Sequence, residues 1–179
     1  MSWLHAVGDL LAPQDCAGCG EAVEGGLLCA GCASRLPSTV WPMEPPEGCR
    51  SAWFFAPYDH PVGAAWRRGK YRPDPFAIDE VVQALVQALP TGRVDAVVPV
   101  PQDLRSSWRR GFFPVGRLAD GVAAALGVER RDPLVRRGGP AQASLPRDQR
   151  LASARAAFRA RGVLEVEDVL LVDDIMTTG

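Results

Sequence analysis

The sharpest change of polarity along the chain lies near its C-terminal end. Residues 169–172 (Val-Leu-Leu-Val) are all apolar and include two β-branched residues, a pattern that predicts a short, central parallel strand buried on both faces. Two adjacent carboxylates, Asp173 and Asp174, follow this strand directly. Because ligands of open α/β sheets bind just beyond the carboxyl ends of the strands, we expect a site at this edge.

Other stretches of the chain have the period of a helix or the composition of a strand. Apolar residues three or four apart predict amphipathic helices that cover a sheet, and short β-branched or aromatic runs predict its strands. Gly127 is positioned to cap one of these helices. The expected helices are 60–69, 76–89, 115–126 and 148–158, and the expected strands are 52–58, 94–98 and 134–135.

Composition and charge narrow the class of protein. The 179 residues are 47% hydrophobic and 23% charged, as in an ordinary globular protein. No apolar run approaches the roughly 20 residues of a membrane span, and residues 1–11 lack the basic segment of a signal peptide. We therefore expect a cytoplasmic protein without membrane insertion. Residues 105–161 carry thirteen Arg against four acidic residues, so this half should face something anionic.

The N-terminal part contains two Cys-x-x-Cys knuckles separated by nine residues. Cys16 and Cys19 form the first, and Cys29 and Cys32 form the second. This spacing is typical of a four-thiolate structural zinc site, in which each knuckle directs two sulfur atoms at one tetrahedral ion. Two disulfides or an iron–sulfur cluster are the alternatives, and a reducing cytoplasm disfavours the disulfides.

A Pro-rich stretch separates the knuckles from the rest of the chain. Residues 37–50 contain four prolines and have no apolar periodicity, as in a linker. We therefore predict a zinc-knuckle head at 1–36, a linker at 37–50 and a larger domain at 51–179.

The residues after the acidic pair suit the binding of a phosphate. Ile175 and Met176 lead into Thr177, Thr178 and Gly179, whose small hydroxyls and backbone N–H groups can surround phosphate oxygens. An ordinary Asp-Asp turn is the alternative, since Asp and Gly are common turn residues.

This run resembles the 5-phosphoribosyl-1-pyrophosphate signature of type I phosphoribosyltransferases. The resemblance implies that Asp173 and Asp174 accept hydrogen bonds from the two ribose hydroxyls, that residues 177–179 surround the 5′-phosphate, and that Mg²⁺ accompanies the sugar pyrophosphate. The signature normally continues to another Thr and a helix, whereas this chain ends at Gly179. We therefore expect either a C-terminally incomplete domain or a natural variant that has lost catalysis, which as it stands binds the sugar pyrophosphate weakly or not at all.

A second segment would receive the pyrophosphate in this interpretation. Pro99, Val100 and Pro101 end the strand expected at 94–98, because two prolines cannot continue a central strand. Arg109 and Arg110 follow, and the planar guanidinium group matches phosphate oxygens. A solvated basic turn is the alternative. Residues 136–146 lack periodicity and are a candidate lid over a ligand.

Nearly the whole chain resembles the ComF family of competence-associated bacterial proteins. The resemblance rests on the paired knuckles, on Lys70-Tyr71, and on further motifs in matching order: 97–101 (Val-Val-Pro-Val-Pro), 108–112 (Trp-Arg-Arg-Gly-Phe), 136–158 with Gln142, Leu145, Arg150 and Phe158, and the closing Asp-Asp-Ile-x-Thr-Thr-Gly. It implies a zinc-finger-like head on a type I phosphoribosyltransferase-like body. Phe113 and Pro140 depart from the family, which usually has Asn and Thr at these positions.

Two functions are therefore expected as alternatives. The first is binding of the sugar pyrophosphate and transfer of its phosphoribosyl group to an acceptor that the sequence does not identify, through positioning and charge neutralisation and without an assigned catalytic residue. The second is a non-catalytic accessory role in DNA uptake, with binding of nucleotide or single-stranded DNA and contacts to competence or helicase proteins. No Cys–His or Ser–His pair suits nucleophilic catalysis, because both histidines lie outside the motifs.

Overall fold

The computed structural model describes residues 14–23, 28–71, 75–90, 92–102, 111–136 and 157–176. The chain divides into two compact units, one formed by Met1–Thr91 with Ile175–Gly179 and the other by Gly92–Asp174. Each unit is described by itself. The predicted division into 1–36, 37–50 and 51–179 stays a prediction.

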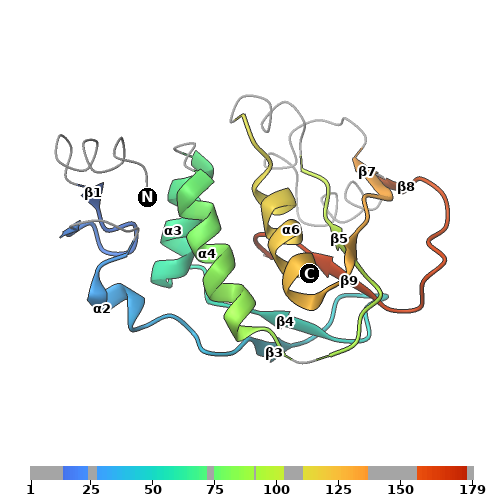
Figure 1. Cartoon of the computed structure of the whole chain (residues 1–179), viewed down its shortest axis with the longest axis horizontal. Helices are drawn as coiled ribbons and strands as arrows, with labels where there is room; N and C mark the ends of the chain where they lie inside the picture. The colour runs from blue at the N-terminus through green and yellow to red at the C-terminus, as the bar shows by residue number, and fades with distance from the viewer. Residues whose placement is uncertain are drawn as a thin grey trace, which may run out of the picture. The chain divides into compact units, whose positions relative to one another are not determined.

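The first unit combines short strands with a pair of helices (Figure 1). Helices α3 and α4 pack against each other through buried residues that include Ala65, Trp66 and Ile78. The strands pair antiparallel, β1 with β2 and β3 with β4. The elements are β1 (Gln14–Asp15), β2 (Ala22–Val23), α2 (Ala30–Ala33), β3 (Trp41–Met43), β4 (Ala52–Phe54), α3 (Pro61–Tyr71) and α4 (Pro75–Ala88).

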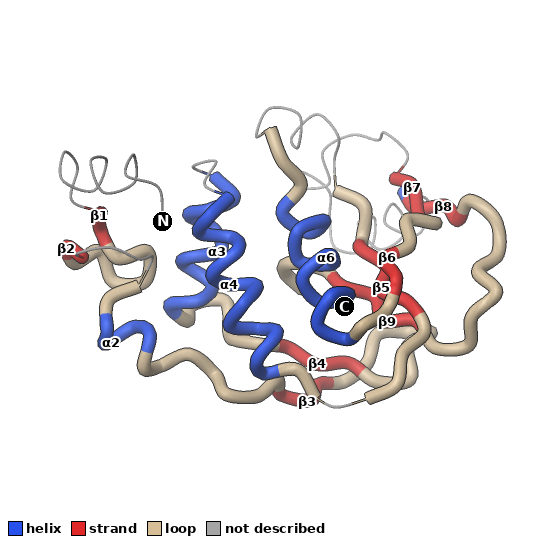
Figure 2. Tube along the Cα trace, viewed as in Figure 1, coloured by secondary structure: helices blue, strands red, loops and turns tan. Residues whose placement is uncertain are grey.

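The second unit has a three-stranded parallel sheet with the order β6-β5-β9. Helix α6 packs against all three strands, and Figure 2 shows the strands side by side. Leu134 pairs with Ala160 in a separate antiparallel ribbon formed by β7 and β8. The elements are β5 (Ala96–Pro99), α6 (Pro114–Leu126), β6 (Glu129–Arg130), β7 (Leu134–Arg136), β8 (Phe158–Ala160) and β9 (Val169–Val172).

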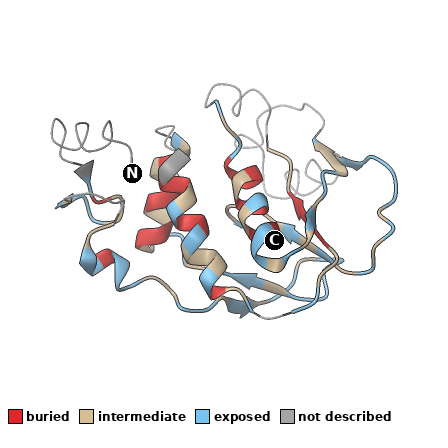
Figure 3. Ribbon diagram, viewed as in Figure 1, coloured by how far each residue is buried: buried red, intermediate tan, exposed pale blue. Residues whose placement is uncertain are grey.

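The core of the second unit lies between β5 and α6 (Figure 3). All four residues of β5 are buried, and Val97, Val115 and Val122 are at most 1% exposed. Gly127 caps α6 in the left-handed conformation, with φ 67°. The helix and its cap agree with the sequence pattern, and the expectation of an α/β protein with a parallel sheet is confirmed.

Two local expectations are corrected. Strand β9 alternates between exposed and half-buried residues, so one of its faces is more exposed than the other, and β5 is its only strand partner among the described residues. The central, fully buried strand is therefore β5. Phe158 belongs to β8, where a helix was expected. The rest of that expected helix, 148–156, lies outside the described residues. Strand β3 lies within residues 37–50, and the interpretation of this stretch as a linker stays a prediction.

No helix among the described residues is both long enough and apolar enough to span a membrane.

Candidate functional site

The four cysteines of the two knuckles converge, as the sequence predicts. Their sulfur atoms all lie within 4.8 Å of one another, and Sγ of Cys19 is 3.7 Å from Sγ of Cys29. A tetrahedral ion with metal–sulfur bonds of about 2.3 Å separates its sulfur ligands by about 3.8 Å. The donor set therefore fits a thiolate-binding metal ion such as zinc.

Local backbone structure prepares one sulfur atom for metal binding. The N–H of Cys29 donates a hydrogen bond to Sγ of Cys16 at 3.2 Å. Burial would raise the pKa of the Cys16 thiol, but hydrogen bonds from Cys29, Cys19 and Gly18 lower this pKa to about 6. Cys32 differs, because burial and the neighbouring thiols raise its pKa to about 12. A bound cation would favour the thiolate at both positions.

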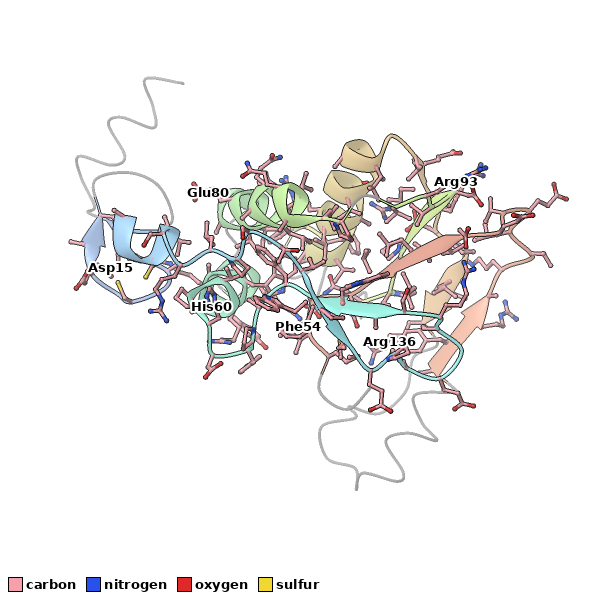
Figure 4. All side chains as sticks on the ribbon, turned by 90° about the horizontal axis from the view of Figure 1, so that it is seen from below. Asp15, Phe54, His60, Glu80, Arg93 and Arg136 are labelled. Atoms are coloured by element: carbon pink, nitrogen blue, oxygen red, sulfur yellow. The ribbon has the colours of Figure 1, made fainter. Side chains whose placement is uncertain are left out.

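Arg68 of helix α3 and His60, directly before this helix, contact the chain on either side of the cysteine cluster. Arg68 donates to the backbone oxygen of Asp15, directly before Cys16, and Nε2 of His60 donates to the backbone oxygen of Arg35 at 3.0 Å. Because Nδ1 of His60 accepts the N–H of Val62, the Nε2 tautomer is the one that fits. Figure 4 shows Asp15 beside the yellow sulfur atoms and His60 at α3.

Glycine is required at one position of the first knuckle. A Cβ atom on Gly18 would lie 2.8 Å from Sγ of Cys32 and 2.9 Å from Cβ of Pro61, the first residue of α3. Because four thiolates fill the tetrahedral shell of one metal ion, no coordination position is left for a substrate, and the arrangement suits a structural role.

The second candidate site lies at the carboxyl edge of the parallel sheet. Pro99 pairs with Val172 in the register of β5 and β9, so the segments that follow both strands begin at the same edge. Asp173 is exposed and Asp174 is half-buried, and the N–H of Asp174 donates to Oδ1 of Asp173 at 2.8 Å. Ile175 and Met176 continue as irregular chain, whereas Thr177, Thr178 and Gly179 lie outside the described residues.

The segment 99–101 offers no backbone hydrogen-bond donor to a ligand. Pro99 and Pro101 lack an N–H group, and the N–H of Val100 donates to the backbone oxygen of Val172 at 2.9 Å. A phosphate near this edge would therefore need donors from residues that follow Pro101. Arg109 and Arg110 lie outside the described residues.

A cleft of about 230 Å³ opens beside this segment. Its walls are the end of β5, the start of α6 and the residues around the end of β6: Pro99, Val100, Pro101, Gln102, Phe113, Val115, Gly116, Arg130, Asp132 and Leu134.

Arg130 is the cation in this wall. Its guanidinium group contacts carboxylate oxygens of Asp120 and Asp132 at 2.9 Å each and donates to the backbone oxygen of Gly116 at 3.3 Å. Partial burial would lower the pKa of Arg130, but the two carboxylates raise it. Arg130 therefore links α6 to the end of β6, and its charge is already compensated.

Sequence reasoning missed Gln102, Arg130 and Asp132. Gln102 follows the Pro-Val-Pro segment directly, and this position at a strand end was the one available signal. Arg130 belongs to an Arg-rich stretch in which nothing marks one residue as the half-buried partner of Asp120 and Asp132.

Magnesium would need oxygen ligands from outside the chain at this edge. Among the described residues, the four cysteines form the one group of three or more potential metal ligands. The acidic pair alone supplies too few oxygen atoms for the octahedral shell of Mg²⁺. This ion usually keeps several water ligands and is also bound by the phosphates of a substrate.

Comparison of the chain with protein-family models, with curated proteins and with solved structures gives no match.

Proposed function

We propose that the protein is phosphoribosyltransferase-like, binds 5-phosphoribosyl-1-pyrophosphate with Mg²⁺ and transfers its phosphoribosyl group to an acceptor. One observation carries the proposal: Pro99, which begins the Pro-Val-Pro segment, pairs with Val172, and the acidic pair follows Val172 directly, so both motifs lie at the carboxyl ends of two adjacent parallel strands. A ligand with hydroxyls at one end and a pyrophosphate at the other could reach both segments at once. The resemblance to the ComF family supports the same assignment.

In this proposal, the chain positions the ligand and compensates charge. Asp173 and Asp174 accept hydrogen bonds from the ribose hydroxyls, and residues 177–179 surround the 5′-phosphate. Magnesium, held by the pyrophosphate and ribose oxygens, neutralises the leaving group. The prolines at 99 and 101 shape the edge without donating hydrogen bonds, so donors to the pyrophosphate come from Gln102 onward, including the arginines of the following segment.

We also propose that the metal in the cysteine cluster is zinc. Four thiolates at tetrahedral spacing favour zinc or an iron–sulfur cluster, and a single ion accounts for all four sulfur atoms. Its role is structural, because four protein ligands leave no open coordination position.

A second candidate function is binding of single-stranded DNA without catalysis, as in an accessory protein of DNA uptake. The excess of nine positive charges in residues 105–161 favours it.

Two assays separate these functions. Mg²⁺-dependent release of pyrophosphate from the sugar pyrophosphate, measured across a panel of acceptors, would support the transferase. Binding of single strands that weakens steeply with salt, without pyrophosphate release, would support the accessory role. Absence of both activities would contradict both functions.

A further inference from the structure

We propose that Gln102 is a positioning residue that orients Asp174 toward the sugar of the bound ligand. This inference rests on the proposed function and adds a residue that none of the sequence motifs includes. It concerns how the acidic pair is held in place.

The side chain of Gln102 joins two elements of the second unit. Its Nε2 donates to Oδ2 of Asp174 at 3.5 Å, and its Oε1 accepts the backbone N–H of Val115 at 3.4 Å. The two partners fix the orientation of the amide, because only its oxygen can accept from an N–H group and only its nitrogen can donate to a carboxylate. The side chain of Gln102 therefore links Asp174, which lies 72 positions further along the chain, to the start of α6.

The anchored end of this amide belongs to a rigid helix. Val115 is the second residue of α6 and is 1% exposed, so its N–H group has a fixed position. The N-cap residue Phe113 provides no side-chain cap, and Pro114 has no N–H group. Oε1 of Gln102 thus accepts a hydrogen bond from one of the first backbone N–H groups of α6, as the side chain of a capping residue would.

The other end of the amide reaches a residue outside regular structure. Asp174 lies two residues after the end of β9, where the ladder with β5 no longer constrains the backbone. A hydrogen bond to Oδ2 restricts the rotation of the carboxylate, and a carboxylate with two oxygens can accept an amide and a hydroxyl together. Pre-orientation of this kind raises affinity by reducing the ordering that ligand binding requires.

A merely structural role, capping of α6, is the competing explanation. The variant Gln102→Glu separates the two roles, since its carboxylate can still accept the N–H of Val115 but cannot donate to Asp174 when ionised. Gln102→Met removes both hydrogen bonds at similar size. Asp174→Asn and the double variant Gln102→Met/Asp174→Asn complete a double-mutant cycle.

The test measures the dissociation constant of the sugar pyrophosphate with Mg²⁺ for all five proteins, and their thermal unfolding. We expect Gln102→Met to weaken binding about fivefold, as for one lost hydrogen bond. Gln102→Glu should weaken binding at least as much, because its carboxylate cannot donate to Asp174 and also repels it, and this repulsion should lower its unfolding temperature somewhat. The double variant should bind no more weakly than Asp174→Asn alone.

Two other results would overturn the inference. If Gln102→Glu binds like the wild type, or if the effects of the two substitutions simply multiply, Gln102 only caps α6. The proposed function would survive either result. If the wild type shows no binding, the proposed function fails and the positioning role fails with it.

Discussion

Pro99 lies directly opposite Val172 in the parallel pairing of β5 with β9. The N–H of the next residue, Val100, donates to the backbone oxygen of Val172, so the two strands remain joined up to their carboxyl ends. The acidic pair, which starts at Asp173, therefore lies beside the Pro-Val-Pro segment. This register brings together two motifs that are more than 70 residues apart in the sequence.

The cysteine cluster predicts a defined metal content. The purified protein should contain about one zinc per chain, and Cys19→Ser should lose it because one thiolate is missing from the tetrahedral set. Elemental analysis measures both. Cys49→Ser is the matched control, since Cys49 is exposed and lies outside the cluster, and it should keep the metal. Iron with acid-labile sulfide in the wild type would exclude zinc.

Loss of the metal should also have a local structural effect. Because metal binding and folding are coupled in such sites, Cys19→Ser should broaden or shift the amide resonances of residues 14–35. Resonances of residues 92–174, which form the other unit, should stay unchanged. A uniform loss of dispersed signals would instead mean that the whole chain depends on the metal.

Gly18 predicts a steric effect at the same cluster. In Gly18→Ala the new methyl group would meet Sγ of Cys32 at 2.8 Å and Pro61 at 2.9 Å, so the knuckle must shift. We expect faster release of zinc to a chromogenic chelator than in the wild type.

Gly31→Ala provides the control for this effect. Its methyl group would have ordinary contact with Sγ of Cys29 at 3.9 Å. Gly31 lies inside α2, where Ala has a higher helix propensity than Gly. Equal release rates for the two variants would contradict the close packing at Gly18.

Asp95 predicts an effect on the stability of the parallel sheet. Its Oδ2 accepts the backbone N–H groups of Glu167 and Asp168 at 3.0 and 2.9 Å, and these residues lead into β9. Asp95→Ala should lower the free energy of unfolding by about 1.5–3 kcal/mol, as for lost hydrogen bonds to a charged group.

Chemical denaturation measures this change. Glu165→Ala removes an exposed carboxylate from the same segment and should leave the stability within about 0.5 kcal/mol of the wild type. Equal stabilities of Asp95→Ala and the wild type would show that these hydrogen bonds contribute nothing.

Local patterns in the sequence predicted the regular elements well. Helices α3, α4 and α6 and strands β5 and β9 lie where periodicity and composition place them, within a few residues. The Cys-x-x-Cys spacing predicted the cluster for a similar reason, because each knuckle is a local structure that directs two sulfur atoms at one point.

Features that depend on distant partners were not predictable in this way. Strand β3 contains Pro42, which argues against a strand, yet a two-stranded ribbon tolerates Pro because its outer edges need no N–H donor. The exposure of β9 follows from its neighbours and not from its own apolar sequence. Likewise, the contacts of Gln102 and Arg130 with α6 join residues far apart in the sequence, and no local pattern encodes them.

The central claim is that the acidic pair binds the sugar of 5-phosphoribosyl-1-pyrophosphate. The most direct measurement is a titration of isotope-labelled protein with this compound and Mg²⁺, followed by NMR, which also detects weak binding. We predict saturable shifts at Asp173, Asp174 and Gln102 that require Mg²⁺.

The same titration of Asp173→Asn/Asp174→Asn provides the decisive comparison. Loss of two charge-assisted hydrogen bonds should weaken binding about 100-fold, so that saturation disappears. Saturable shifts of the same midpoint in this variant, or no shifts at these residues in the wild type, would contradict the claim.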